Sequence, residues 1–80
     1  MLQLKPNCEC CYLDLPPDAD ARICSFECTF CPDCAERRFA GACPNCGGNF
    51  VPRPIRPAQL LGRFPPSGER FTKAHAACAA

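Results

Sequence analysis

The large apolar residues of this 80-residue chain are few, and no stretch of them is long enough to span a membrane. The hydrophobic fraction is 48%, but 10 of those residues are Cys and 11 are Ala. Because ordering a chain costs roughly 1.5 kcal/mol per residue, so small a core needs covalent or metal cross-links. Four phenylalanines lie beside cysteines or between cysteine pairs, which predicts a small core around fixed sites: Phe26, Phe30, Phe39 and Phe50.

The pattern along the chain predicts little regular secondary structure. Residues 13–22 are expected to form a loop, since adjacent prolines exclude helix and aspartates favour turns. A brief strand is expected at Arg22–Phe26. Residues 50–57 carry three prolines and should be extended, close to polyproline II. Residues 58–63 can form a helical turn, which the following Pro-Pro-Ser-Gly segment ends.

One short helix is expected directly after Cys34. Asp33 can cap it, with Glu36 three residues later as in a capping box, and Gly41 marks its end. Residues 43–48 (CPNCGG) predict a tight knuckle.

Ten cysteines indicate either a disulfide framework or metal binding. The N-terminal residues MLQLKPNCECC carry no basic start, no apolar run of signal length and no small-residue cleavage site. We therefore expect a cytoplasmic protein, in which thiols stay reduced and paired CxxC spacing favours metal.

Eight of the cysteines form four pairs, which is enough for two tetrahedral zinc sites. The pairs are Cys8 with Cys11, Cys24 with Cys28, Cys31 with Cys34, and Cys43 with Cys46. In a sequential arrangement the first two pairs share one ion and the last two share the other. In an interleaved arrangement the first and third pairs share one ion, and the second and fourth share the other. Spacing alone leaves both arrangements open.

The eight-ligand spacing resembles that of the RING finger, whose last knuckle is written CPxC, as in residues 43–46. The resemblance implies a RING-like cross-brace with two zinc sites, one short helix, little sheet and an extended Pro-rich C-terminal tail. It favours the interleaved arrangement, although Cys28 stands where the family usually has His. Under that arrangement, site 1 comprises Cys8, Cys11, Cys31 and Cys34, and site 2 comprises Cys24, Cys28, Cys43 and Cys46.

Nearly the whole chain is also similar to a family of small bacterial cysteine-rich proteins, domain-of-unknown-function family 1272. The similarity lies in PNCECC, ARICSFECTFCPDCAE, CPNCGG and the RPIRPA segment. It implies a fold and no mechanism.

No catalytic residues are expected, and the protein is expected not to be an enzyme. Eight thiolates would close both zinc sites, whereas catalytic zinc keeps one position open. The single histidine, His75, lies in the tail. His75 and Cys78 have the spacing of a further ligand pair, but an exposed histidine and cysteine are the simpler interpretation. RING ligases dock their partner enzyme through positions that here hold Cys10, Phe39 and Gly47, and two of these three depart from the pattern.

Charge divides the chain into a two-zinc module, residues 1–50, and a basic Pro-rich tail, residues 51–80. The module carries four basic and seven acidic residues, and the tail carries five basic residues and one acidic residue. We expect the tail to be partly docked on the acidic module or disordered, with apolar contacts from Ile55, Leu60 and Leu61. Nucleic acid is a weaker alternative, because an acidic module repels phosphate.

The sequence therefore predicts a zinc-binding structural module with two Zn²⁺ per chain that acts as a protein-interaction or adaptor domain. Another protein is the expected partner, and no membrane association is expected. The oligomeric state is left open. The alternative is a thiol-based metal or redox sensor, or a zinc store, using Cys10 and Cys78. Seven aromatic residues argue against a simple store. Cys10 follows Glu9 and should be a protonated, slowly reacting thiol.

Overall fold

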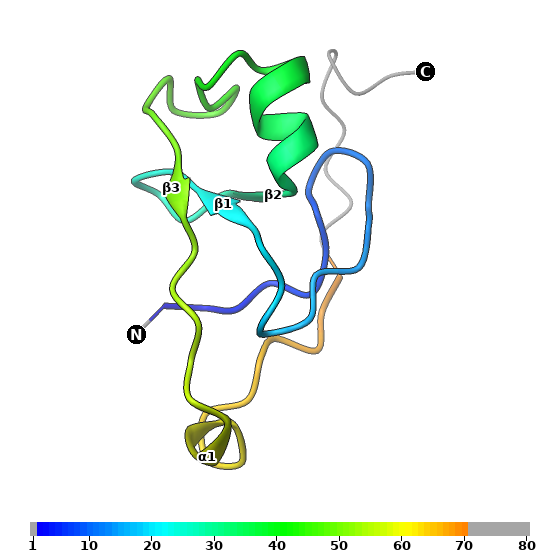
Figure 1. Cartoon of the computed structure of the whole chain (residues 1–80), viewed down its shortest axis with the longest axis vertical. Coiled ribbons are helices and arrows are strands. Elements are labelled where there is room, and N and C mark those ends of the chain that lie inside the picture. Colours follow the sequence, from blue (N-terminus) through cyan, green and yellow to red (C-terminus); the bar gives the residue numbers. More distant parts are fainter. Residues whose placement is uncertain (1, 71–80) are drawn as a thin grey trace.

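The computed structural model describes residues 2–70, and short elements connected by turns make up this part of the chain (Figure 1). Three strands each contain two residues: β1 (Arg22–Ile23), β2 (Thr29–Phe30) and β3 (Val51–Pro52). A π-helix, η1, spans Cys34–Arg38, and a single α-helical turn, α1, spans Ala58–Leu61. No helix within residues 2–70 is long and apolar enough to cross a membrane.

The strands form an antiparallel sheet in the order β2-β1-β3. Arg22 lies opposite Phe30 on one side and Pro52 on the other. The strand expected at Arg22–Phe26 therefore exists but ends at Ile23. It ends there because Cys24 begins a turn, in which the Glu27 N–H donates to the Cys24 carbonyl over 3.0 Å. A sheet this small depends on other contacts for its stability.

The helix expected after Cys34 is present, but its predicted capping box is wrong. Asp33 has helical backbone angles and its side chain makes no cap hydrogen bond. Its carboxylate instead pairs with Arg37 Nε over 3.0 Å, one helical turn further on. The Phe39 N–H donates to the Cys34 carbonyl over 3.1 Å, the five-residue spacing of a π-helix. The helix ends close to Gly41, as expected, but Ala40 is the first residue with a positive φ (+51°). Gly41 follows with a φ of +82°, and its N–H donates to the Ala35 carbonyl over 2.8 Å.

The core is a cluster of aromatic rings among cysteines. Phe30 is fully buried, and its ring packs edge-on against Phe39 and Phe50, with centroids 4.9 and 5.6 Å away. The prediction that Phe26 joins this core is wrong, since Phe26 is 76% exposed. Phe26 lies on the turn between Cys24 and Cys28, whose backbone faces the sulfur atoms and leaves the ring in solvent.

Arg53 joins three segments that are distant in sequence. Its guanidinium donates to the Lys5 carbonyl over 3.0 Å and to the Pro16 carbonyl over 2.9 Å. Its backbone N–H donates to the Ala21 carbonyl over 2.8 Å. The residue is only 4% exposed, and burial lowers the pKa of its guanidinium. The N-terminal segment, the loop before β1 and the chain after β3 are thus held by one side chain.

Two further arginines contact the first part of the chain. Arg56 donates to the carbonyls of Leu2 and Phe64, each over 2.6 Å. Arg70 pairs with Asp14 over 2.6 Å and donates to the Tyr12 carbonyl. The expected apolar contacts are largely wrong, because Ile55 and Leu60 are exposed. Leu61 is half-buried. Backbone carbonyls, rather than apolar side chains, hold this segment.

Replacing Arg53 with Met is expected to lower the free energy of unfolding by about 3 kcal/mol. The change removes two charged hydrogen bonds, each contributing roughly 1.5–3 kcal/mol, and leaves two carbonyls unpaired. Urea unfolding of the metal-loaded chain, followed by nuclear magnetic resonance, measures the change. Arg63→Met is the matched control, because Arg63 is exposed and lies 5.7 Å from the Phe64 ring. Equal losses in both variants would contradict this role of Arg53.

Candidate metal centres

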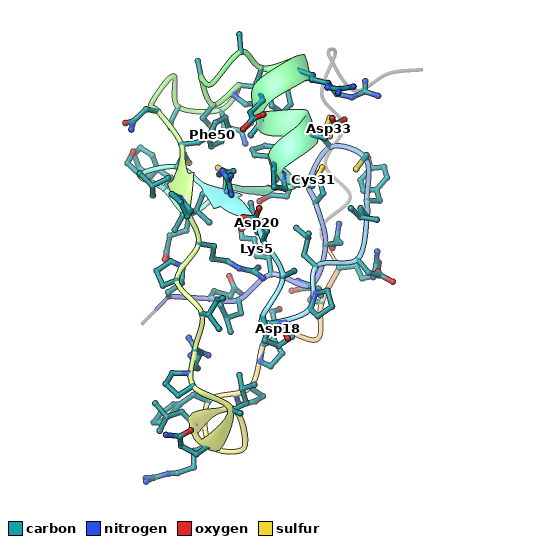
Figure 2. The ribbon with its side chains drawn as sticks, in the orientation of Figure 1. Lys5, Asp18, Asp20, Cys31, Asp33 and Phe50 are labelled. Atoms are coloured by element: carbon teal, nitrogen blue, oxygen red, sulfur yellow. The ribbon has the colours of Figure 1, made fainter. Side chains whose placement is uncertain are left out.

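The four sulfur atoms of site 1 lie within 4.8 Å of one another. Cys8 and Cys11 come from the turn that follows the N-terminal segment. Cys31, labelled in Figure 2, and Cys34 lie where the chain leaves β2 and enters η1. Sulfurs bound at about 2.3 Å to one tetrahedral zinc ion lie about 3.8 Å apart. The Cys11 and Cys31 sulfurs are 3.8 Å apart, so this pair has the separation of two thiolates on one tetrahedral ion.

Three of the four site 2 sulfurs also lie within 4.8 Å of one another: those of Cys24, Cys28 and Cys43. Cys46 interacts with Cys24 and Cys43 but lies outside this group. The structure thus places the third cysteine pair with the first, and Cys43 with the second pair. A sequential arrangement would instead require the sulfurs of Cys8 and Cys11 to lie with those of Cys24 and Cys28.

Backbone N–H groups point at the first sulfur of each cysteine pair. The N–H donors lie 3.3–3.5 Å from sulfur, and the four bonds are Cys10 to Cys8, Phe26 to Cys24, Cys34 to Cys31, and Asn45 to Cys43. Gly48 donates in the same way to Cys46 over 3.4 Å. Hydrogen bonds that orient ligands and stabilise their charge are a general feature of metal sites. The knuckles are therefore shaped to present thiolates.

Glu9 anchors the first knuckle to the sheet. Its buried carboxylate accepts hydrogen bonds from the Thr29 N–H over 2.5 Å and from Lys5 Nζ over 3.1 Å. The Glu9 N–H donates in turn to the Thr29 carbonyl over 2.9 Å. These bonds fix the position of Cys8 relative to Thr29, the first residue of β2, which lies two residues before Cys31. Sequence reasoning missed this role, because the contact joins Glu9 to Thr29, which is 20 residues away in the sequence.

Burial opposes ionisation of most of the clustered thiols. It raises the pKa of Cys24 to about 12, whereas the Gly48 N–H lowers the pKa of Cys46 to about 7. Burial also raises the pKa of three other thiols: Cys31, Cys34 and Cys43. A cation among the sulfurs would offset the cost of burying several thiolates, so this chemistry fits a metal ion.

Cys10 belongs to neither sulfur group. It is buried, 3% exposed, and it is disulfide-bonded, whereas the other eight cysteines within residues 2–70 are free thiols. The expectation of a free, slowly reacting thiol at Cys10 is therefore wrong for this structure. His75 and Cys78 lie outside the described residues.

Comparisons with known proteins agree with this picture of a small cysteine-rich chain. The model of the family described as "protein of unknown function (DUF1272)" matches residues 1–56. An uncharacterised protein of Rhizobium meliloti (strain 1021) is 61% identical over 74 residues, covering 91% of this chain and 88% of that protein. No solved structure matches this chain. The family match includes the seven cysteines of the two sulfur groups and Cys46, and the chain belongs to the DUF1272 family.

Proposed function

We propose that this protein is a structural zinc-binding module that holds two Zn²⁺ ions in a RING-like cross-brace. The observation that carries the proposal is site 1, where the four sulfurs gather and the Cys11–Cys31 separation is 3.8 Å. Zinc suits a set of four thiolates, because it is a borderline-soft ion and its electron configuration does not disfavour a tetrahedral arrangement. Site 1 would be filled by Cys8, Cys11, Cys31 and Cys34, and site 2 by Cys24, Cys28, Cys43 and Cys46.

The zinc ions would be structural rather than catalytic. Cysteine sulfurs make up both groups, and no histidine or carboxylate belongs to either one within residues 2–70. Two carboxylates lie next to site 1 ligands in the sequence. Glu9, beside Cys8, is buried and engaged by Lys5 and Thr29, so it is committed to holding the knuckle. Asp33, beside Cys34, is paired with Arg37 Nε over 3.0 Å.

A protein is the partner that this surface suits best, as an adaptor domain would require. Ile55 is 61% exposed and Leu60 is 40% exposed. A hollow of about 360 Å³ lies beside them, lined mainly by apolar side chains that include Pro17, Pro57 and Leu61. Exposed apolar surface next to a hollow is typical of interaction sites. Affinity purification with mass spectrometry would identify the partner.

A thiol-based sensor is the second candidate, and the disulfide bond of Cys10 favours it. Cys10 lies between two site 1 ligands, so oxidation there would act directly on that knuckle.

Native mass spectrometry of the full chain tests both candidates. We expect two zinc ions per chain before and after mild peroxide treatment, because coordinated thiolates of a structural site are shielded by their ion. A sensor would lose zinc under peroxide and regain it after reduction. A folded chain that never holds zinc would contradict both candidates.

A further inference from the structure

We propose that the two metal centres differ in lability, with site 2 exchanging its ion and Cys46 acting as the ligand that leaves. This inference rests on the proposed zinc-binding function. It assigns an exchangeable position to one centre and a permanent structural role to the other. The incoming ligand is a soft donor, such as a thiolate.

The arrangement of the sulfur atoms separates the two centres. All four site 1 sulfurs lie within 4.8 Å of one another, as a closed tetrahedral site requires. In site 2 only three do so, and Cys46 is the member that falls outside. Cys46 remains near Cys24 and Cys43, so it can reach an ion held by the other three.

Exposure alone does not distinguish the centres, because Cys11 of site 1 is more exposed than Cys46. Cys11 is nevertheless held 3.8 Å from Cys31, at the distance of a tetrahedral pair. Cys46 combines partial exposure with a sulfur that does not lie within 4.8 Å of all three other site 2 sulfurs. This combination occurs at no other site 1 or site 2 cysteine.

Polar groups outside the cluster can hold the Cys46 sulfur when it leaves. The Gly48 N–H donates to it over 3.4 Å, and Ser25 Oγ lies 3.9 Å away. A Cβ atom at residue 48 would lie 3.4 Å from that sulfur and 3.5 Å from Ser25 Oγ. Both distances are ordinary van der Waals contacts, so residue 48 lies directly beside the Cys46 sulfur and Ser25 Oγ.

The exchange step is a ligand substitution without electron transfer. A bond forms between zinc and the incoming thiolate while the bond between zinc and Cys46 breaks, so the number of thiolates on the ion is unchanged. The released Cys46 thiolate keeps its electron pair and either accepts the Gly48 N–H or takes a proton from water.

Zinc release from the loaded full chain to an excess of a chelating dye tests the inference. We expect two phases of one ion each, with rates differing by about tenfold or more, the usual scale on which ligand surroundings alter metal sites. Cys46→Ser should accelerate only the fast phase. Cys11→Ser, the matched control at an exposed site 1 ligand, should accelerate only the slow phase.

Alkylation during release keeps the test independent of whether these variants fold. In the wild-type chain, mass spectrometry of peptides should show Cys46 labelled first among the eight thiols. A single release phase, a fast phase unchanged by Cys46→Ser, or first labelling of Cys11 would overturn the inference. A chain that binds no zinc would overturn the proposed function itself, whereas two equally labile ions would overturn only this inference.

Discussion

Removing the metal with a strong chelator is expected to unfold the part of the chain described by the structure. Structural zinc contributes roughly 10–16 kcal/mol of apparent binding free energy, and in a domain this small that energy is folding energy. The remaining core is centred on three aromatic rings, and the strands have two residues each. Neither this small core nor this small sheet stabilises the fold enough to offset the conformational entropy that the chain loses on folding.

Amide dispersion in nuclear magnetic resonance spectra is the suitable measurement, because so little regular secondary structure gives a weak circular dichroism signal. The dispersed spectrum of the loaded chain should collapse on chelation and return when zinc is added. Magnesium is the control cation, since thiolates do not suit it and it should not restore the fold. A spectrum that stays dispersed without metal would show that the sulfur groups are not folding sites.

The second large effect is expected from paired cysteine substitutions that separate the two ligand arrangements. Cys8 and Cys34 belong to the same sulfur group, so Cys8→Ser with Cys34→Ser should remove one ion and leave the other group complete. Cys8 and Cys28 belong to different groups, so Cys8→Ser with Cys28→Ser should damage both centres. Native mass spectrometry and the absorption of cobalt-substituted chains measure the result.

The two double variants carry the same number and type of substitutions and so control for each other. A sequential arrangement would reverse the expected results of the two variants, because Cys8 and Cys28 would then share an ion while Cys8 and Cys34 would not. Loss of one ion in the Cys8 and Cys28 variant would therefore contradict the interleaved arrangement.

Local features of the sequence determined where the elements and knuckles lie. The close spacing of cysteines in each pair brings two sulfurs to one turn whatever the rest of the chain does. The helix ends just before Gly41, where Ala40 and Gly41 both have a positive φ, which glycine adopts readily. The short strand at Arg22 and the turn at residues 58–61 follow equally local preferences.

Interactions between distant segments had to be decided by the tertiary structure. Spacing could not say which cysteine pairs meet, because that depends on how β2 and the first knuckle are joined, and Glu9 joins them through Thr29. Asp33 had two possible partners, and the side chain of Arg37 replaced the predicted cap. Phe26 carries the same apolar signal as Phe30, but only one of them faces the core.

The role of Arg53 shows most clearly why the sequence alone was insufficient. In the sequence it is one basic residue of a Pro-rich segment, and net charge suggested attraction to an acidic module. In the structure it is buried, and its partners are the carbonyls of Lys5 and Pro16. Every residue offers a carbonyl, so no side-chain pattern marks these two as acceptors. Only the folded chain, by bringing residues 5, 16 and 53 together, selects them.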